Sequence, residues 1–235
     1  MNTLSANKLL QVWEKGRAQH PVDRALLLLA VAEPEHTYNR LADWSVGQRD
    51  AAILRLRITT FGSRFSAYLN CPECNARLEM AFDGRFFQLP SQSDRTTIEF
   101  DGSSFRLPTS RDLARIAHET DPVAAVRRLL ALCCEQCEGA IGADWSETAL
   151  QEIESRMAEA DPQADIELNL ACELCGHCWQ SMFDVAAFFW EEIEANAKRL
   201  LQEVHLLASS YGWSEDEVLA LSDVRRAAYL EMAGT

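Results

Sequence analysis

Four cysteines in two short, identical motifs are the residues of this chain best suited to chemistry. Cys71 and Cys74 form one Cys-x-x-Cys motif, and Cys172 and Cys175 form another. A Cys-x-x-Cys turn brings two sulfurs close enough to bind one ion, and zinc prefers tetrahedral coordination by four such ligands. Two turns complete that coordination shell and leave no open position. The pattern therefore predicts one structural Zn²⁺ ion and not a catalytic metal.

The separation of the two motifs is unusual. In a compact zinc finger about 15 to 20 residues lie between the cysteine pairs, whereas residues 75–171 lie between them here. Each motif adjoins a segment in which polar and apolar residues alternate as in a strand, at residues 77–83 and 166–170. We therefore expect two hairpins that hold one ion between their turns, with a long insertion that leaves and returns to a split zinc ribbon.

The insertion contains a second candidate thiol or metal site. Cys134 and Cys137 lie three residues apart near the end of an apparent helix closed by Gly139, so their thiols would share one helical face. The competing interpretation is that these thiols pack as small apolar side chains, because cysteine is among the most buried residue types. No role is assigned to Cys133 or Cys178.

Composition and charge limit the classes of partner. The chain has 235 residues, 48% of them hydrophobic, so it can bury a substantial core. Its formal net charge of -14 disfavours nucleic acid, because phosphate backbones repel an acidic surface. No apolar run approaches the roughly 20 residues of a membrane span, and the N-terminus does not resemble a signal peptide. We expect a cytoplasmic protein with reduced cysteines and without nucleic-acid or membrane partners.

Helical patterns precede and follow the cysteine motifs. Residues 1–66 are predicted to form an N-terminal helical unit, in which Ser45 and Gln48 make a capping box. Residues 185–235 are predicted to form a C-terminal helical unit, whose first helix runs from residue 185 to about residue 210 and ends at Gly212. These units and the region between them are expected to form one composite domain.

The central region, residues 67–184, is predicted to contain the split ribbon and an insertion at about residues 90–165. Asp101-Gly102 between two short alternating segments is typical of a β-hairpin. Helical patterns follow, with Ser110 as a candidate cap and Asp161-Pro162 as a stop. The predicted fold class is α+β and mainly helical, a split four-cysteine zinc ribbon with a long insertion and flanking N- and C-terminal helices.

Three successive aromatic residues form a candidate partner-docking patch. Phe188, Phe189 and Trp190 cannot all face the same side of a helix, so at least one is expected to reach a partner. The interpretation that the sequence favours places them in the core, because apolar clusters of this size are more often buried than exposed. The sequence has no glycine-rich phosphate loop and no nucleophile elbow, so no catalytic residue is assigned.

Several segments carry a family resemblance: residues 107–113 (Leu-Pro-Thr-Ser-Arg-Asp-Leu), 158–165, 172–179, 188–205, 211–215 and 219–222. They resemble a family from phage-tail-like gene clusters and extracellular contractile injection systems, related to the T-even phage baseplate hub assembly chaperones. The resemblance implies a non-enzymatic structural or chaperone-like protein of a contractile baseplate. Its partners would be baseplate or tail proteins, and it could be incorporated in the tail-like particle. The family's paired knuckles match Cys71, Cys74, Cys172 and Cys175.

Two other functions stay open as alternatives. A zinc ribbon can bind nucleic acid, but acidic residues such as Glu73, Glu79 and Glu173 surround these motifs. A thiol or zinc enzyme needs an exposed reactive thiol or an open coordination position, and a closed four-cysteine site supplies neither.

Overall fold

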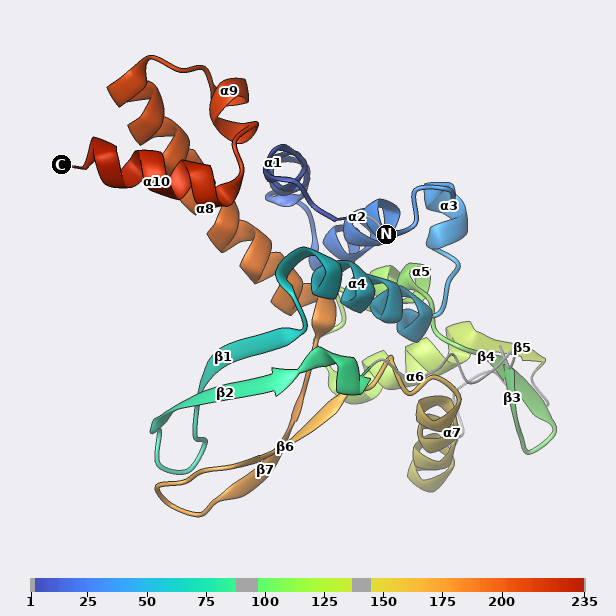
Figure 1. The fold of residues 1–235 in the computed structure, drawn as a ribbon. Coiled ribbons are helices and arrows are strands. Elements are labelled where there is room, and N and C mark those ends of the chain that lie inside the picture. The colour runs from blue at the N-terminus through green and yellow to red at the C-terminus, as the bar shows by residue number, and fades with distance from the viewer. Residues whose placement is uncertain (1–2, 88–96, 137–144, 235) are drawn as a thin grey trace.

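The computed structural model describes residues 3–87, 97–136 and 145–234 of the chain. Its class is α+β, with helices predominating over three small antiparallel sheets, as predicted. Figure 1 shows a group of helices in the middle, two hairpins that extend from it, and further helices on either side. No helix in the described ranges combines the length and apolar character needed to cross a membrane.

Four helices open the chain: α1 (Ala6–Gly16), α2 (Pro21–Ala32), α3 (Tyr38–Leu41) and α4 (Val46–Phe61). The predicted capping box of α4 is confirmed, because the backbone N–H groups of Ser45 and Gln48 each donate to the other residue's side chain. Helix α4 ends at Gly62, whose φ of 88° lies in a region that glycine tolerates best. Strand pairing starts soon afterwards, at Arg64, inside the range predicted to be helical.

The two hairpins are separate two-stranded sheets. Strand β1 (Arg64–Asn70) pairs with β2 (Arg77–Asp83), and β6 (Glu167–Ala171) pairs with β7 (Cys178–Met182). A short 3-10 helix, η1 (Gly84–Phe87), follows β2. The strands predicted at residues 77–83 and 166–170 are thus confirmed, and each cysteine motif is the turn of its hairpin.

The insertion has its own sheet and helices: β3 (Thr97–Phe100), β4 (Ser103–Arg106), α5 (Ser110–Ile116), α6 (Pro122–Cys133), β5 (Cys134–Gln136) and α7 (Glu147–Ala160). The predicted hairpin at Asp101-Gly102 is confirmed; both turn residues have positive φ. The N-cap of α5 is Thr109 and not Ser110, because the Asp112 side chain reaches back to the Thr109 backbone N–H. Ser110 is the first helical residue.

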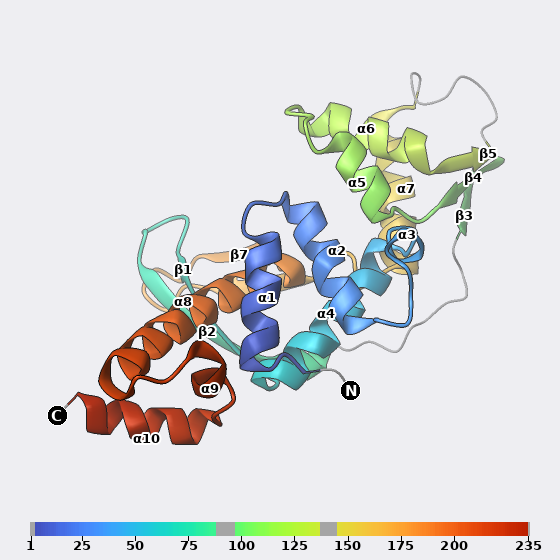
Figure 2. The same cartoon turned by 90° about the horizontal axis from the view of Figure 1, so that it is seen from above.

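The last helices are α8 (Val185–Tyr211), α9 (Glu215–Leu219) and α10 (Asp223–Ala233). Gly212 ends α8 in the left-handed conformation, as predicted. Helix α10 lies back against α8, where the buried Arg226 binds Glu203 of α8 and Asp223 of its own first turn. Seen from above, α10 and α5 lie toward opposite ends of the molecule (Figure 2).

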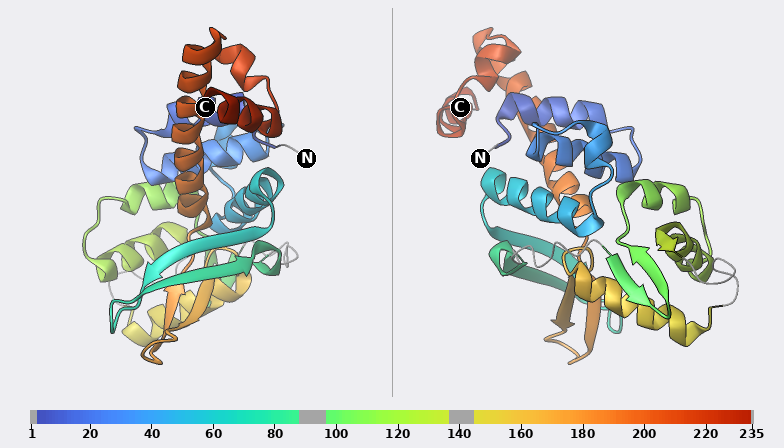
Figure 3. Two further views of the ribbon diagram at one scale, coloured as in Figure 1. Left: turned by 60° about the vertical axis from the view of Figure 1, so that its left-hand side comes forward. Right: turned by 90° about the vertical axis from the view of Figure 1, so that its right-hand side faces the viewer.

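Two larger apolar cores and one smaller cluster organise these elements, and the smaller cluster joins α2, α3 and α4 through residues such as Leu29 and Leu41. The first joins α1, α2, α4 and α8 to the bases of the hairpins, through residues such as Leu28, Ile53, Phe65 and Ile193. The second lies within the insertion and joins β3, β4, α6 and α7. Figure 3 shows the helices of the first core above the hairpins and the insertion to one side. The predicted N- and C-terminal helical units therefore share one core.

Candidate metal centre

The four predicted cysteines meet at the tips of the hairpins. The Sγ atoms of Cys71 and Cys175 lie 3.7 Å apart, as do those of Cys74 and Cys172, and all four sulfurs lie within 4.8 Å of one another. Both close pairs join one hairpin to the other. The turns of β1–β2 and β6–β7 are visible at the same end of Figure 1. The structure thus brings together residues that are distant in sequence.

The two turns have the same backbone geometry. In the first, the Cys71 N–H donates to the Ala76 carbonyl and the Asn75 N–H donates to the Cys71 carbonyl. In the second, the Cys172 N–H donates to the His177 carbonyl and the Gly176 N–H donates to the Cys172 carbonyl. Asn75 and Gly176 occupy equivalent positions with φ of 56° and 73°, and asparagine and glycine are the residues that adopt this conformation most readily.

The sulfur spacing fits a single tetrahedral ion. Zinc–thiolate bonds of about 2.3 Å at tetrahedral angles separate the sulfurs by about 3.8 Å, close to the 3.7 Å observed. A disulfide needs a separation of about 2.05 Å, and all four cysteines are free. Cys71 and Cys172 are buried while Cys74 and Cys175 are exposed, so the cluster sits at the surface of the tips.

The crowded thiols resist losing all of their protons. Backbone N–H groups of Cys175 and Leu174 lower the pKa of Cys172 to about 7, with help from its thiol neighbours. At Cys175 the His177 backbone N–H acts in the lowering direction, but desolvation and three neighbouring thiols outweigh it and raise the pKa to about 12. A divalent cation removes this conflict, because it replaces the protons and neutralises the thiolates.

The neighbours of the second motif stand outside the cluster. Cys178 is exposed on β7, with its Sγ 3.7 Å from the Gly176 carbonyl oxygen. The His177 ring stacks on Trp179, with the ring centroids 5.8 Å apart. Within the described ranges, only the four motif cysteines form a group of three or more residues able to hold a metal.

The predicted second thiol site lies only partly within the described residues. Helix α6 ends at Cys133, and Cys134 begins β5, where it pairs with Phe105 of β4, so the expected helical face does not continue past Cys133. Cys134 is disulfide-bonded, contrary to the expectation of reduced cysteines, and Cys137 lies outside the described residues. Burial raises the pKa of Cys133 to about 12, which fits a packed thiol. The apolar pattern of α6 runs on into Cys134, and β5 is short with two exposed polar residues, so the sequence concealed the boundary.

The aromatic docking patch is also corrected. Phe189 and Trp190 are buried in the first core. The Phe188 ring is partly buried and contacts the rings of Phe65 and Phe183, with centroids 5.3 and 5.5 Å apart. Helix α8 begins at the hairpin bases, where helices and strands surround it on several sides. For this reason Phe188, Phe189 and Trp190 are all at least partly buried, although they follow one another along the helix.

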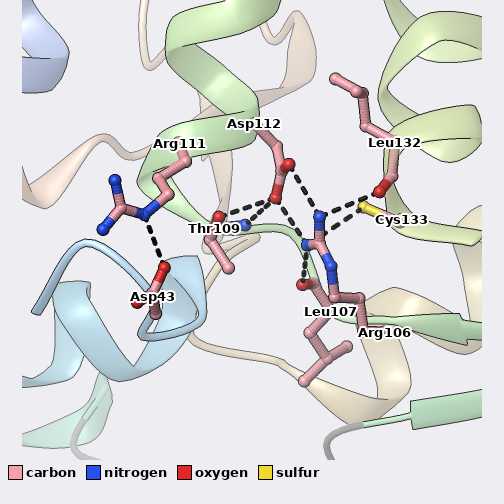
Figure 4. Close-up of polar contacts among 8 residues, drawn as sticks. All are labelled: Asp43, Arg106, Leu107, Thr109, Arg111, Asp112, Leu132 and Cys133. Carbon is pink, nitrogen blue, oxygen red and sulfur yellow. Dashed lines mark hydrogen bonds and ion pairs between the residues drawn. The ribbon is translucent and has the colours of Figure 1, made fainter. Parts of the chain in front are cut away.

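A polar network in the insertion was not predicted. Both carboxylate oxygens of Asp112 accept hydrogen bonds from Arg106, which also donates to the Leu132 carbonyl (Figure 4). Thr109 donates its backbone N–H and its hydroxyl to the same carboxylate. Burial acts to raise the pKa of Asp112, but these bonds outweigh it and hold the pKa below its ordinary value. The Thr109–Asp112 spacing of a capping box was the signal available in the sequence.

Hydrogen bonds also join the insertion to α4. The Val46 N–H donates to the Pro108 carbonyl, and the Gly47 N–H donates to Asp161 Oδ2 at 2.9 Å. A Cβ atom at Gly47 would collide with the Asp161 carboxylate, so this close approach requires glycine. Residues 108 and 161 thus attach both sides of the insertion to the start of α4.

Comparison with families of known proteins gives a match to most of the chain. The model of a family described as T4 bacteriophage base plate protein matches residues 29–190. That range includes both hairpins, all four clustered cysteines and the insertion. No curated protein and no solved structure matches the chain.

Proposed function

The chain belongs to the T4 bacteriophage base plate protein family, and on this premise we propose that it is a non-enzymatic, chaperone-like assembly protein of a contractile phage-tail-like base plate. The family match over residues 29–190 carries the proposal, since it covers more than the cysteine turns alone. The frame of helices and hairpins, with four thiols clustered at the hairpin tips, supports a role in holding surfaces in place. The partners would be base plate or tail proteins.

We propose that Cys71, Cys74, Cys172 and Cys175 hold one structural Zn²⁺ ion. A tetrahedral set of four thiolates selects zinc or iron over hard cations such as magnesium. The ion would cross-link the hairpin tips and leave no position for a substrate. Elemental analysis of the purified protein should give one zinc per chain. Iron in its place, or a stoichiometry near zero after purification with zinc present, would contradict the assignment.

Co-expression tests the proposed partners. The protein would be produced with each base plate or tail protein encoded near its own gene, and complexes would be isolated by affinity and size-exclusion chromatography. We expect a defined complex with at least one of them. Failure to form a complex with any of them, alone or in combination, would overturn the proposal.

Deletion of the gene distinguishes an assembly protein from a permanent component. We propose that the protein acts in the cytoplasm during assembly of the tail, so deletion should abolish complete particles. A chaperone-like protein should be absent from purified particles or present below one copy per partner. Stoichiometric incorporation would instead identify a structural component of the base plate.

A further inference from the structure

An apolar groove lies between α6 and α7 of the insertion, away from the cysteine cluster. Its volume is about 330 Å³, within the range of pockets that take small ligands or a few side chains. Its two walls are formed by Val126, Leu129 and Leu130 of α6 and by Glu154, Met157 and Ala158 of α7.

The floor of the groove is the core of the insertion itself. Leu130 and Met157 are 2% and 8% exposed and belong to that core. Val126 and Leu129 pack against it but stay partly exposed. An apolar side chain entering the groove would therefore contact a fixed surface, and its burial would be favourable.

The rim of the groove is acidic. Glu154 and Asp165 are exposed beside it, and no lining residue is lysine or arginine. Arg156 lies on the same helix as Glu154, but its guanidinium forms an ion pair with Glu152 and donates to the Glu99 carbonyl. A ligand with a cation next to its apolar side chains would complement this rim.

Two sequence segments that the metal centre does not explain meet at this groove. Pro108 belongs to the segment 107–113, and Ala158, Asp161, Ala164 and Asp165 belong to the segment 158–165. Pro108 and Asp161 also bond to the start of α4. The groove is thus held at the junction between the insertion and the main core.

We propose that this groove binds an amphipathic helix of a base plate partner, with apolar side chains in the groove and a lysine or arginine facing Glu154 and Asp165. The inference rests on the proposed function. A helix fits because the walls are themselves helices, whose side-chain ridges can accept a third helix. An extended strand would gain no ladder, because the backbone groups of α6 and α7 are already bonded within each helix.

Matched variants of the full chain test the groove. Val126→Glu places a charge in the groove, whereas Val123→Glu makes the same change on α6 at a side chain that is 60% exposed and outside the lining. Glu154→Lys alters the rim, and Glu159→Lys is its control on α7. Binding to the co-expressed partner would be measured by calorimetric titration, and folding by circular dichroism.

We expect Val126→Glu to weaken binding at least about tenfold, as changes at central interface residues do. Glu154→Lys should also weaken binding, because it places a like charge against the cation of the partner, and both controls should bind like the wild type. Glu154→Lys changes only an exposed side chain and should fold normally, so its binding tests the groove even if Val126→Glu unfolds. Equal binding by all four variants would overturn the groove and leave the proposed function standing. If the wild type bound no base plate protein, the proposed function would fail and the groove proposal with it.

Discussion

The bases and the tips of the two hairpins are held by different means. At the bases, Phe65 stacks on Phe82 and meets the edge of Phe183, with ring centroids 5.0 and 5.8 Å apart. At the tips, no described residue of either turn belongs to an apolar core, and Leu174 is 77% exposed. The hairpins also share no hydrogen-bonded sheet. Packing therefore holds the bases, while the tips depend on the four thiols and the ion proposed to join them.

The largest expected effect is the loss of the metal. Cys172→Ser removes one of four ligands, so metal content should fall from one ion per chain to nearly none, because structural zinc depends on a complete ligand set. Elemental analysis measures the metal, and hydrogen exchange at residues 71–77 and 172–178 should show freed tips. The core around α4 and α8 should keep its protection.

Cys178→Ser is the matched control, since it removes an exposed thiol of the same hairpin that lies outside the cluster. It should retain the metal. Full metal retention in Cys172→Ser, or unfolding of the helices with the tips, would contradict the division between base and tip.

The second effect concerns the bases. Phe65 is fully buried, and its ring carries the Arg57 guanidinium 3.6 Å from the centroid. Phe65→Ala should lower the free energy of unfolding by about 3 to 5 kcal/mol, as large-to-small changes in cores do, while the metal stays bound below the transition. Urea unfolding measures the loss. Phe86→Ala, at an 81% exposed side chain, should change stability by less than about 0.5 kcal/mol.

A smaller effect is expected in the polar network of the insertion. Asp112→Asn weakens the carboxylate bonds to Arg106 and should cost about 1.5 to 3 kcal/mol at pH 7. The folded pKa of Asp112 lies below its ordinary value of 3.8, so its contribution is present above pH 3.8 and is lost as the pH falls through the folded pKa. The difference between wild type and variant in urea should therefore shrink at the acid end.

The exposed pair of Asp43 and Arg111, with N and O atoms 2.6 Å apart, supplies the comparison for this change. Asp43→Asn should cost no more than about 1 kcal/mol, because solvent screens the pair. If Asp43→Asn lowered the free energy of unfolding more than Asp112→Asn did, the exposed pair and not the Asp112 network would be the stronger stabilising contact.

The smallest effect compares the two turns with each other. Gly176→Asn should leave metal affinity nearly unchanged, because Asn75 already occupies the equivalent left-handed position. Gly176→Val should weaken affinity, since a β-branched residue at positive φ is strained. Competition with a chelator measures both. Equal affinity for the two variants would mean that the turn geometry does not control the site.

Short-range patterns in the sequence predicted much of this structure. Ser45 and Gln48, Asp101-Gly102 and Gly212 each act on immediate neighbours, so their elements could be located without the fold. The cysteine turns could be matched across the chain because zinc needs four ligands. The pairing of Gly47 with Asp161 left no comparable signal, since any carboxylate can accept from a backbone N–H. At Phe189 and Trp190, burial depended on elements that pack from other parts of the chain.

The distance along the chain between the two turns has a further consequence. With an ion bound, residues 74–172 form a closed ring whose ends stay fixed whatever the insertion does. The entropic cost of closing a flexible loop rises by only about 0.6 kcal/mol for each doubling of its length. Loops of the insertion could therefore be lengthened or shortened at little entropic cost, as long as Pro108 and Asp161 keep their hydrogen bonds to the start of α4.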